Sequence, residues 1–209
     1  MPDPTQYVGQ CVRYRINPGQ ANLGNGPLQP VTGQTEVANL TIGNDPRNPE
    51  AGGTFWNFTF LKYNAGEVTT CPLMGNVMTG PFSGCYAFTY TDAGLPKLAH
   101  VGTAHSPEDA GSIRAKQIWQ NIVSGGATNI KGESPFKHFT PGEQARISSE
   151  NRNQLPIVCS YYEPPKAWVI LFIPAVAGVS VIPGALRIAA AKPMPQLDWN
   201  LVRAMREFK

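Results

Sequence analysis

The sequence has little charge and no long hydrophobic run. Only 15% of its 209 residues are charged, and 17 Lys and Arg against 14 Asp and Glu give a net charge of +3. No basic run exceeds two adjacent residues, so a groove that tracks nucleic-acid phosphates is not expected. The longest apolar stretch, 167–182, is interrupted by Pro174 and Gly178 and is shorter than the roughly 18 residues of a membrane span. We therefore expect neither a nucleic-acid nor a membrane partner.

The usual cofactor and metal motifs are also missing. The sequence has no phosphate-binding Gly-Lys loop, no dinucleotide fingerprint, no paired His on a helix and no G-x-S-x-G elbow. Zinc sites use Cys and His in close pairs, and only His100 and His105 lie near each other. The cysteines are widely separated: Cys11, Cys71, Cys85 and Cys159. We expect no metal and no organic cofactor.

No secretory leader is visible at the start of the sequence. Residues 1–10 carry Pro, Asp and Gln where a leader has a basic segment and an apolar one. The chain is long enough to build a core without a disulfide framework, so we expect free thiols. A disulfide between Cys71 and Cys85 is the alternative if the protein matures in an oxidising compartment.

Glycine and proline are frequent, with 21 and 20 residues, and they occur without a period. They break long helices, which excludes helical bundles and collagen. Short segments rich in Thr, aromatic and β-branched residues lie between them, a pattern typical of sandwiches. The predicted strands are 6–16, 35–42, 54–63, 67–71, 83–90, 97–103, 155–162, 167–173, 176–182 and 185–191. We predict an α+β fold, in which one β-sandwich-centred domain spans residues 1–209 and carries two or three flanking helices.

The clearest strand is 54–63. Because side chains alternate along a strand, Trp56, Phe58 and Phe60 form an aromatic row on one face, which we expect in the core.

Helix signals follow the middle strands. Ser106 is a suitable N-cap, Pro107 suits the first helical position, and Gly125 ends the apolar periodicity. A second, polar helix is predicted at 141–151, and an amphipathic one at 197–208.

A hairpin is predicted around residues 91–94, which read as a turn. Folding the flanking strands antiparallel brings position 100 opposite or diagonal to position 85. Cys85 follows Ser83 and Gly84 at a strand start, where backbone N–H groups are accessible. A free thiol with a pKa of about 8.5 is mostly protonated at neutral pH, and an adjacent imidazole raises the thiolate fraction. Cys85 and His100 therefore form a candidate nucleophile and base.

The surrounding residues carry a family resemblance. The run from Thr79 to Cys85, TGPFSGC, followed by 86–90 and LAHVGT at 98–103, resembles the active-site signature of bacterial cysteine-dependent glutamine deamidases. This group includes cytotoxic necrotizing factor, the Burkholderia lethal factor and the chemotaxis-receptor deamidase. The resemblance covers residues 79–103 only.

The resemblance implies roles for the matched residues. Cys85 would be the nucleophile and His100 the base, and Thr79 would orient the His100 ring. Backbone N–H groups of Gly84 and Cys85 would stabilise the oxyanion. The implied reaction converts a target-protein glutamine to glutamate through a thioester, and a deamidase-toxin-like fold is expected.

The resemblance also bears on partners and location. It implies an effector, acting as a monomer on a host or target-cell protein, that is secreted by a leaderless route into a target-cell cytoplasm.

The loops are expected to determine specificity, because loops vary most freely on a rigid sheet. We expect the loops 17–34, 44–53 and 125–140 to form walls around the thiol.

Other functions stay open. A binding module, with Cys85 and His100 as buried packing, is the first alternative. A cysteine protease or a transglutaminase is the second alternative. A Cys–His pair can catalyse peptide cleavage and transglutamination as well as deamidation. We expect His105 and His138 to be surface or capping residues.

Overall fold

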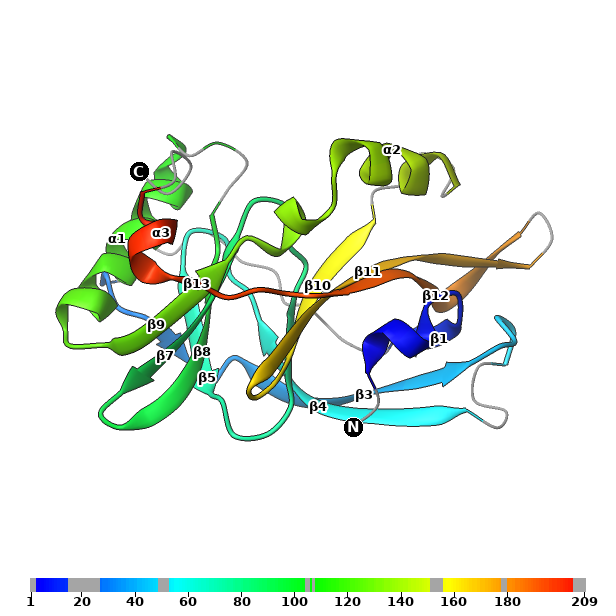
Figure 1. Cartoon of the computed structure of the whole chain (residues 1–209), viewed down its shortest axis with the longest axis horizontal. Helices are drawn as coiled ribbons and strands as arrows, with labels where there is room; N and C mark the ends of the chain where they lie inside the picture. The colour runs from blue at the N-terminus through cyan, green and yellow to red at the C-terminus, as the bar shows by residue number, and fades with distance from the viewer. Residues whose placement is uncertain are drawn as a thin grey trace.

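The computed structural model describes residues 3–14, 27–48, 53–103, 106, 108–150, 156–177 and 180–204. Its fold is mixed α+β, as predicted, and it contains two β-sheets. Figure 1 shows the two sheets side by side, with α1 and α3 on the outer side of the second one. No helix in these ranges is long and apolar enough to cross a membrane.

The first sheet is a closed seven-stranded barrel, not half of a sandwich. Its strands, in spatial order, are β1 (Cys11–Tyr14), β12 (Ser180–Pro193), β11 (Lys166–Ala177), β10 (Ile157–Glu163), β6 (Val77–Gly80), β4 (Thr54–Lys62) and β3 (Thr35–Gly43). The barrel closes because β1 pairs with both β12 and β3. Register shifts between β11 and β12 add the bends that closure requires. The predicted β-sandwich is therefore wrong, because this long-range pairing leaves no edges on the sheet.

The second sheet has six strands. Their spatial order is β13 (Leu197–Asp198), β9 (Thr128–Glu133), β7 (Tyr86–Asp92), β8 (Leu95–Val101), β5 (Val68–Pro72) and β2 (Val31–Thr32). One face is covered by α1 (Ala110–Ser124) and α3 (Trp199–Val202), with Phe88 stacked on Trp119 at a centroid distance of 4.2 Å. The other face packs against the outside of the barrel.

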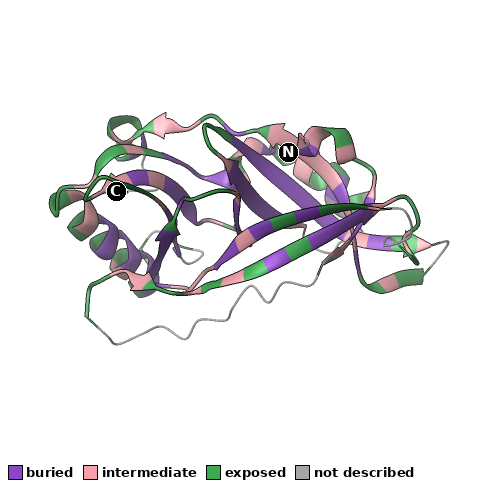
Figure 2. Cartoon of the chain, turned by 90° about the horizontal axis from the view of Figure 1, so that it is seen from below, coloured by how far each residue is buried: buried purple, intermediate pink, exposed green. Residues whose placement is uncertain are grey.

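Burial alternates along the strands as the side-chain period requires. The aromatic row Trp56, Phe58 and Phe60 is buried inside the barrel, which confirms the predicted core, and Phe55 of the same strand is exposed. Figure 2 shows this alternation. Strand β11 is the exception and is buried along most of its length, because one face points into the barrel and the other toward the second sheet.

Two apolar clusters matter for the site. The barrel core fills the barrel interior: Val12, Ala38, Leu40, Ile42, Trp56, Phe58, Phe60, Met78, Cys159, Tyr161, Trp168, Ile170, Phe172 and Ile188. The interface core lies between the barrel and the second sheet: Leu61, Cys71, Leu73, Val77, Phe82, Cys85, Ala87, Leu98, Phe139, Ile147, Val158, Tyr162, Ala167, Val169, Leu171, Ile173 and Met194.

Helix α1 begins later than predicted. Its N-cap is Asp109, whose carboxylate accepts a hydrogen bond from the Gly111 N–H at 2.7 Å, and not Ser106. Gly125 ends the helix as predicted. Pro107 and the C-terminal part of the predicted helix 197–208, from Met205 on, lie outside the described residues.

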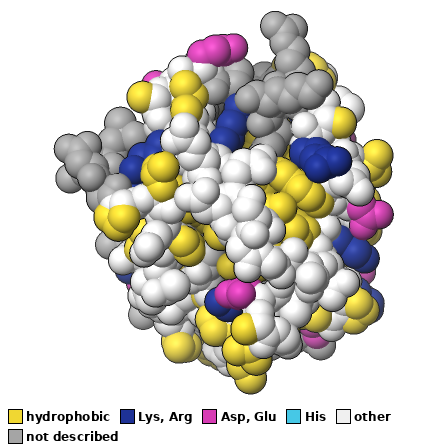
Figure 3. Space-filling view, turned by 90° about the vertical axis from the view of Figure 1, so that its left-hand side faces the viewer, with side chains coloured by type: hydrophobic (Ala, Val, Ile, Leu, Met, Phe, Trp, Pro, Cys, Tyr) yellow, Lys and Arg dark blue, Asp and Glu magenta, His cyan; other side chains and the backbone are white. Residues whose placement is uncertain are grey.

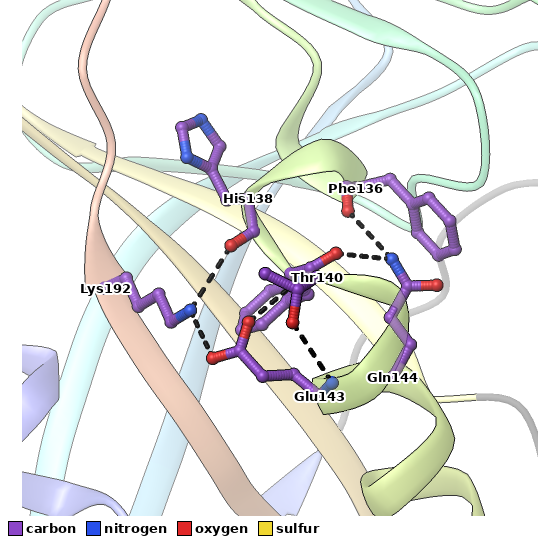
Figure 4. A network of polar contacts seen from close by, with 7 residues as sticks. Phe136, His138, Thr140, Glu143, Gln144 and Lys192 are labelled. Atoms are coloured by element: carbon purple, nitrogen blue, oxygen red, sulfur yellow. Dashed lines mark hydrogen bonds and ion pairs between the residues drawn. The ribbon is translucent and has the colours of Figure 1, made fainter.

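Helix α2 (Pro141–Glu150) is held on the barrel by a polar network, shown in Figure 4. Thr140 and Glu143 form a reciprocal cap at its start, with N–H to side-chain oxygen distances of 2.8 and 3.2 Å. Lys192 of β12 donates to the Glu143 carboxylate and to the His138 carbonyl. The pKa of Glu143 is lowered to about 2 by the Lys192 hydrogen bond and the Thr140 N–H. The short 3-10 helices η1 (Pro4–Tyr7) and η2 (Pro135–His138) complete the elements.

Candidate active site

The β7–β8 hairpin places Cys85 and His100 on one face of the second sheet. The two strands pair antiparallel across a tight turn at Ala93 and Gly94, which confirms the predicted hairpin. His100 lies directly opposite Ala87, and Cys85 precedes Ala87 by two residues. Cys85 and Ala87 both belong to the interface core, so the thiol lies diagonal to the imidazole on the face that packs against the barrel.

Thr79 joins the barrel to His100. Its hydroxyl lies 2.8 Å from Nδ1 of His100 and donates to the Leu61 carbonyl at 2.8 Å. A threonine hydroxyl has one proton, and here the Leu61 carbonyl receives it. The Nδ1–H of His100 must therefore donate to Thr79, which leaves Nε2 as the unprotonated nitrogen of the neutral ring.

The His100 ring is fully buried between two aromatic side chains. Phe82 stacks on it at a centroid distance of 4.3 Å and an angle of 5°, and Tyr63 stacks at 5.4 Å and 24°. Its exposed fraction is 0%, and desolvation lowers the pKa of His100 to about 3, so the ring is neutral. Within the described part of the chain, Nε2 has no hydrogen-bond partner. The ring therefore holds an unprotonated nitrogen in an apolar setting.

Cys85 is held by the segment that follows β8. Its thiol donates to the Thr103 carbonyl at 3.3 Å, and the Thr103 hydroxyl donates to the Gly84 carbonyl at 2.7 Å. Burial raises the pKa of Cys85 to about 11, although backbone hydrogen bonding from Ser83 and Gly84 partly favours the thiolate. No hydrogen bond joins Cys85 to His100 among the residues described here.

This environment differs from the activated thiol that the sequence suggested. A thiolate is favoured by nearby positive charge or an ion pair, whereas here both groups are buried and neutral. As folded, the thiol and imidazole are a neutral pair on one sheet face. Proton transfer between them requires the thiol to leave the Thr103 carbonyl.

All four cysteines are free and buried. The alternative Cys71–Cys85 disulfide is therefore absent. Cys71 lies in the interface core as well, and burial raises its pKa to about 12.

The loops expected as walls lie largely elsewhere. Much of 125–140 is regular structure, with β9 in the second sheet and η2 after it. Residues 44–48 follow β3 of the barrel. Residues 17–26 and 49–52 fall outside the described ranges. His100 is instead surrounded by the aromatic rings of Tyr63 and Phe82 and by Thr79 of strand β6. The expectation that loops form the walls therefore did not identify these residues.

The other histidines are not part of this site. His105 lies outside the described residues. His138 is in η2, with Nε2 3.6 Å from a Glu133 carboxylate oxygen. No group of three or more His, Cys, Asp or Glu side chains in the described ranges is arranged to hold a metal ion.

Two surface pockets, both lined by described residues, do not open onto the site. One pocket of about 480 Å³ is lined by Lys166, Trp168 and neighbouring residues, and one of about 260 Å³ by Cys71 and Lys97 among others. Neither includes Cys85, His100 or Thr79. Figure 3 shows the end of the molecule that carries α1, where no described His side chain reaches the visible surface. Because Cys85 is 3% exposed and His100 is fully buried, the site is closed as folded.

Two further polar residues, which the sequence did not single out, lie beside the trio. Thr69 of β5 pairs directly with His100, and Ser160 of β10 pairs directly with Thr79. Both are fully buried. Neither shows a local motif, since only the strand pairing brings them to the site.

No protein-family model, no curated protein and no solved structure matches this chain. The assignment of chemistry to the site therefore depends on its geometry and on the local resemblance of residues 79–103.

Proposed function

We propose that the protein is a cysteine-dependent protein-glutamine deamidase, with Cys85 as nucleophile and His100 as base. The observation that carries this proposal is the Leu61–Thr79–His100 hydrogen-bond chain. It directs the protonated ring nitrogen to Thr79 and leaves Nε2 unprotonated, on the sheet face that carries the Cys85 thiol. A general base needs this tautomer, because a nitrogen that already carries a proton cannot accept one.

The first half of the reaction forms a thioester. The Cys85 sulfur attacks the carboxamide carbon of a glutamine side chain while Nε2 of His100 takes the thiol proton. The oxyanion is stabilised by the backbone N–H groups of Gly84 and Cys85. The C–N bond then breaks, and the imidazolium returns the proton to the leaving nitrogen, which departs as ammonia.

The second half releases glutamate. Nε2 of His100 takes a proton from water, the water oxygen attacks the thioester carbon, and the C–S bond breaks. The imidazolium then protonates the Cys85 sulfur. The Thr79 hydroxyl accepts from Nδ1–H throughout and stabilises the positive ring while it lasts. These residues supply the groups for each step, so the proposed route uses no metal or organic cofactor.

The site must open before the reaction: transient opening admits a small reagent, and the bound target protein holds the site open for its glutamine. Cys85 is 3% exposed and His100 is fully buried, so a glutamine side chain reaches neither in the folded conformation. Opening breaks the bond between the thiol and the Thr103 carbonyl and frees the thiol to turn toward Nε2. A buried, neutral thiol also limits side reactions until the substrate is bound.

The resemblance to deamidase toxins extends the proposal to the setting of the reaction. We infer a deamidase-toxin-like effector that enters a target-cell cytoplasm by a leaderless route and acts as a monomer. Its product carries a new negative charge on the target, which is enough to disrupt a functional surface.

One observation favours the alternative of a binding module. Val37 and Phe55, on neighbouring strands of the barrel, are 91% and 65% exposed, while Cys85 and His100 are buried like ordinary packing residues. In that case the barrel surface would contact a partner and the Cys–His pair would have no chemistry.

Expression in target cells separates the two functions. Wild type, Cys85→Ser and Cys71→Ser are expressed at equal levels, and the proteome is searched by mass spectrometry for glutamine-to-glutamate conversions. Cys71 is the matched control, because it is a free, buried cysteine of the same interface core. We expect conversions at specific sites with wild type and Cys71→Ser, and none with Cys85→Ser. Equal spectra for all three would contradict the deamidase and favour the binding module.

A further inference from the structure

Four polar side chains form a row across the interface between the barrel and the second sheet. Thr69 pairs with His100 within the second sheet, His100 is hydrogen-bonded to Thr79 across the interface, and Thr79 pairs with Ser160 within the barrel. Each of the four has an exposed fraction of 0%. The directly paired residues have Cβ atoms about 5 Å apart and side chains on the same face.

The two ends of the row and the unprotonated ring nitrogen have no hydrogen-bond partner in the described part of the chain. The Thr69 hydroxyl, the Ser160 hydroxyl and Nε2 of His100 make no hydrogen bond to the described residues. Leaving a buried hydroxyl unpaired costs about 1–3 kcal/mol, so such groups are rare in packed cores. The indole nitrogens of Trp56 and Trp119 also lack a hydrogen-bond partner among the described residues, but each lies apart, whereas these three atoms lie at one site next to the proposed nucleophile.

Thr69 and Ser160 differ in what surrounds them. Ser160 lies near the Tyr162 phenol: burial raises the pKa of Tyr162, and the nearby Ser160 hydroxyl lowers it in part, although the two groups do not meet the distance and angle limits of a hydrogen bond. Its paired neighbour, Thr79, already bonds both Leu61 and His100. Thr69 is instead paired with the residue whose nitrogen is free. The Thr69 hydroxyl is therefore the one placed to share a ligand with Nε2.

We propose that Thr69 and Nε2 of His100 together hold the water that hydrolyses the thioester, so that Thr69 sets the balance between hydrolysis and transfer to an amine. This inference rests on the proposed function. A water molecule needs two or more polar partners in a buried site, and a hydroxyl can accept from it or donate to it. The Thr69 hydroxyl oxygen accepts a hydrogen bond from one water O–H and Nε2 removes the other proton. The water oxygen attacks the thioester carbon, the C–S bond to Cys85 breaks, and the imidazolium returns its proton to the sulfur.

The test uses an acyl donor that needs no target protein. p-Nitrophenyl acetate acetylates a thiol and releases p-nitrophenolate, and intact-protein mass spectrometry follows the loss of the acetyl group from Cys85. Wild type is compared with Thr69→Val, which keeps the shape and removes the hydroxyl, and with Thr69→Ser, which keeps the hydroxyl. Ser160→Ala is the matched control, since it removes an unpaired, fully buried hydroxyl from the barrel end of the row.

We expect acetyl-Cys85 to hydrolyse about tenfold more slowly in Thr69→Val, which corresponds to one lost hydrogen bond to the attacking water. Cleavage by added hydroxylamine should be unchanged, because the amine does not depend on this hydroxyl. Thr69→Ser should restore hydrolysis, and Ser160→Ala should behave as wild type.

The outcomes separate this inference from the proposed function. If wild type is acetylated at Cys85 but Thr69→Val hydrolyses at the wild-type rate, or Ser160→Ala is slowed equally, the role of Thr69 is wrong and the nucleophile stands. A parallel slowing of hydroxylamine cleavage would indicate a distorted site and also overturn the role. If Cys85 is acetylated no faster than Cys71, the proposed function itself fails.

Discussion

The barrel core and the interface core are equally buried but chemically different. In the barrel core, aromatic side chains pack on one another, as Trp56 does on Tyr161 at a centroid distance of 5.0 Å. The interface between the barrel and the second sheet instead contains the hydrogen-bonded pair Thr79 and His100. It also contains the hydroxyls of Thr69 and Ser160, which make no hydrogen bond to any residue that the structure describes. Burial alone therefore does not distinguish a core from a site. The distinction lies in whether the buried polar atoms gather around a group that can react.

The largest effect is expected in the barrel core. Phe60→Ala removes a fully buried ring from the barrel interior and leaves a cavity, so the free energy of unfolding should fall by about 3–5 kcal/mol. Urea denaturation measures this change. Phe55→Ala in the same strand is the control, because Phe55 is 65% exposed and its loss should cost less than about 0.5 kcal/mol. Similar losses for both variants would show that the barrel interior is not tightly packed.

A smaller loss of stability with a large loss of function is expected at the interface. Thr79→Val leaves the Nδ1–H of His100 buried and unpaired, so the free energy of unfolding should fall by about 1–3 kcal/mol. The acylation rate of Cys85 should fall about a hundredfold, because the ring loses the group that fixes its tautomer. Urea denaturation and p-nitrophenolate release measure the two effects. Thr79→Ser keeps the hydroxyl and should retain most of the stability and most of the acylation rate. A fully active Thr79→Val would contradict the role of the Thr79–His100 hydrogen bond.

Acid should destabilise the protein through His100. Burial lowers the pKa of His100 to about 3, below the 6.5 of an exposed imidazole. Between these pH values the unfolded chain binds a proton that the folded chain does not. The free energy of unfolding should therefore decrease as pH falls from 6.5 toward 3, by about 1 kcal/mol per pH unit from this group. Urea denaturation at several pH values checks the slope. His100→Phe lacks the group, and an unchanged slope in that variant would show that His100 titrates normally.

The smallest effect concerns access to the thiol. Thr103→Val removes the hydroxyl bond to the Gly84 carbonyl and loosens the segment that holds Cys85. A buried thiol is alkylated through transient opening, so iodoacetamide should label Cys85 about three- to tenfold faster in the variant than in wild type. Cys159, inside the barrel, is the internal reference and should not change. Rapid labelling of wild-type Cys85 would contradict the closed site.

The sequence predicts the local elements of this structure, such as single strands and a hairpin, better than the closure of the barrel. Alternation identified the aromatic row of β4, and the turn signal before Leu95 identified the β7–β8 hairpin, because both depend on neighbouring residues. The register stayed open between opposite and diagonal placement of positions 85 and 100, and the structure has the diagonal one. The barrel depends on β1 meeting both β3 and β12, strands far apart in the chain, which no local pattern encodes. The short strand β6, which carries Thr79, was not predicted at all.

The same limit applies to the site. The resemblance implied that Thr79 contacts His100, and that hydrogen bond is present. Thr69 and Ser160 could not be found from the sequence, because their positions follow from pairing in two different sheets. The burial that keeps Cys85 and His100 neutral could not be predicted from the sequence either, because it arises only when the barrel packs on the second sheet.

Every role proposed for the interface requires that Nδ1 of His100 carries the proton and Nε2 does not. Nitrogen-15 NMR of histidine-labelled protein at neutral pH reads this directly from the chemical shifts and proton couplings of the two ring nitrogens. We predict a neutral His100 ring protonated at Nδ1, and a loss of this preference in Thr79→Val. A ring protonated at Nε2, or at both nitrogens, would contradict the base assigned to this site.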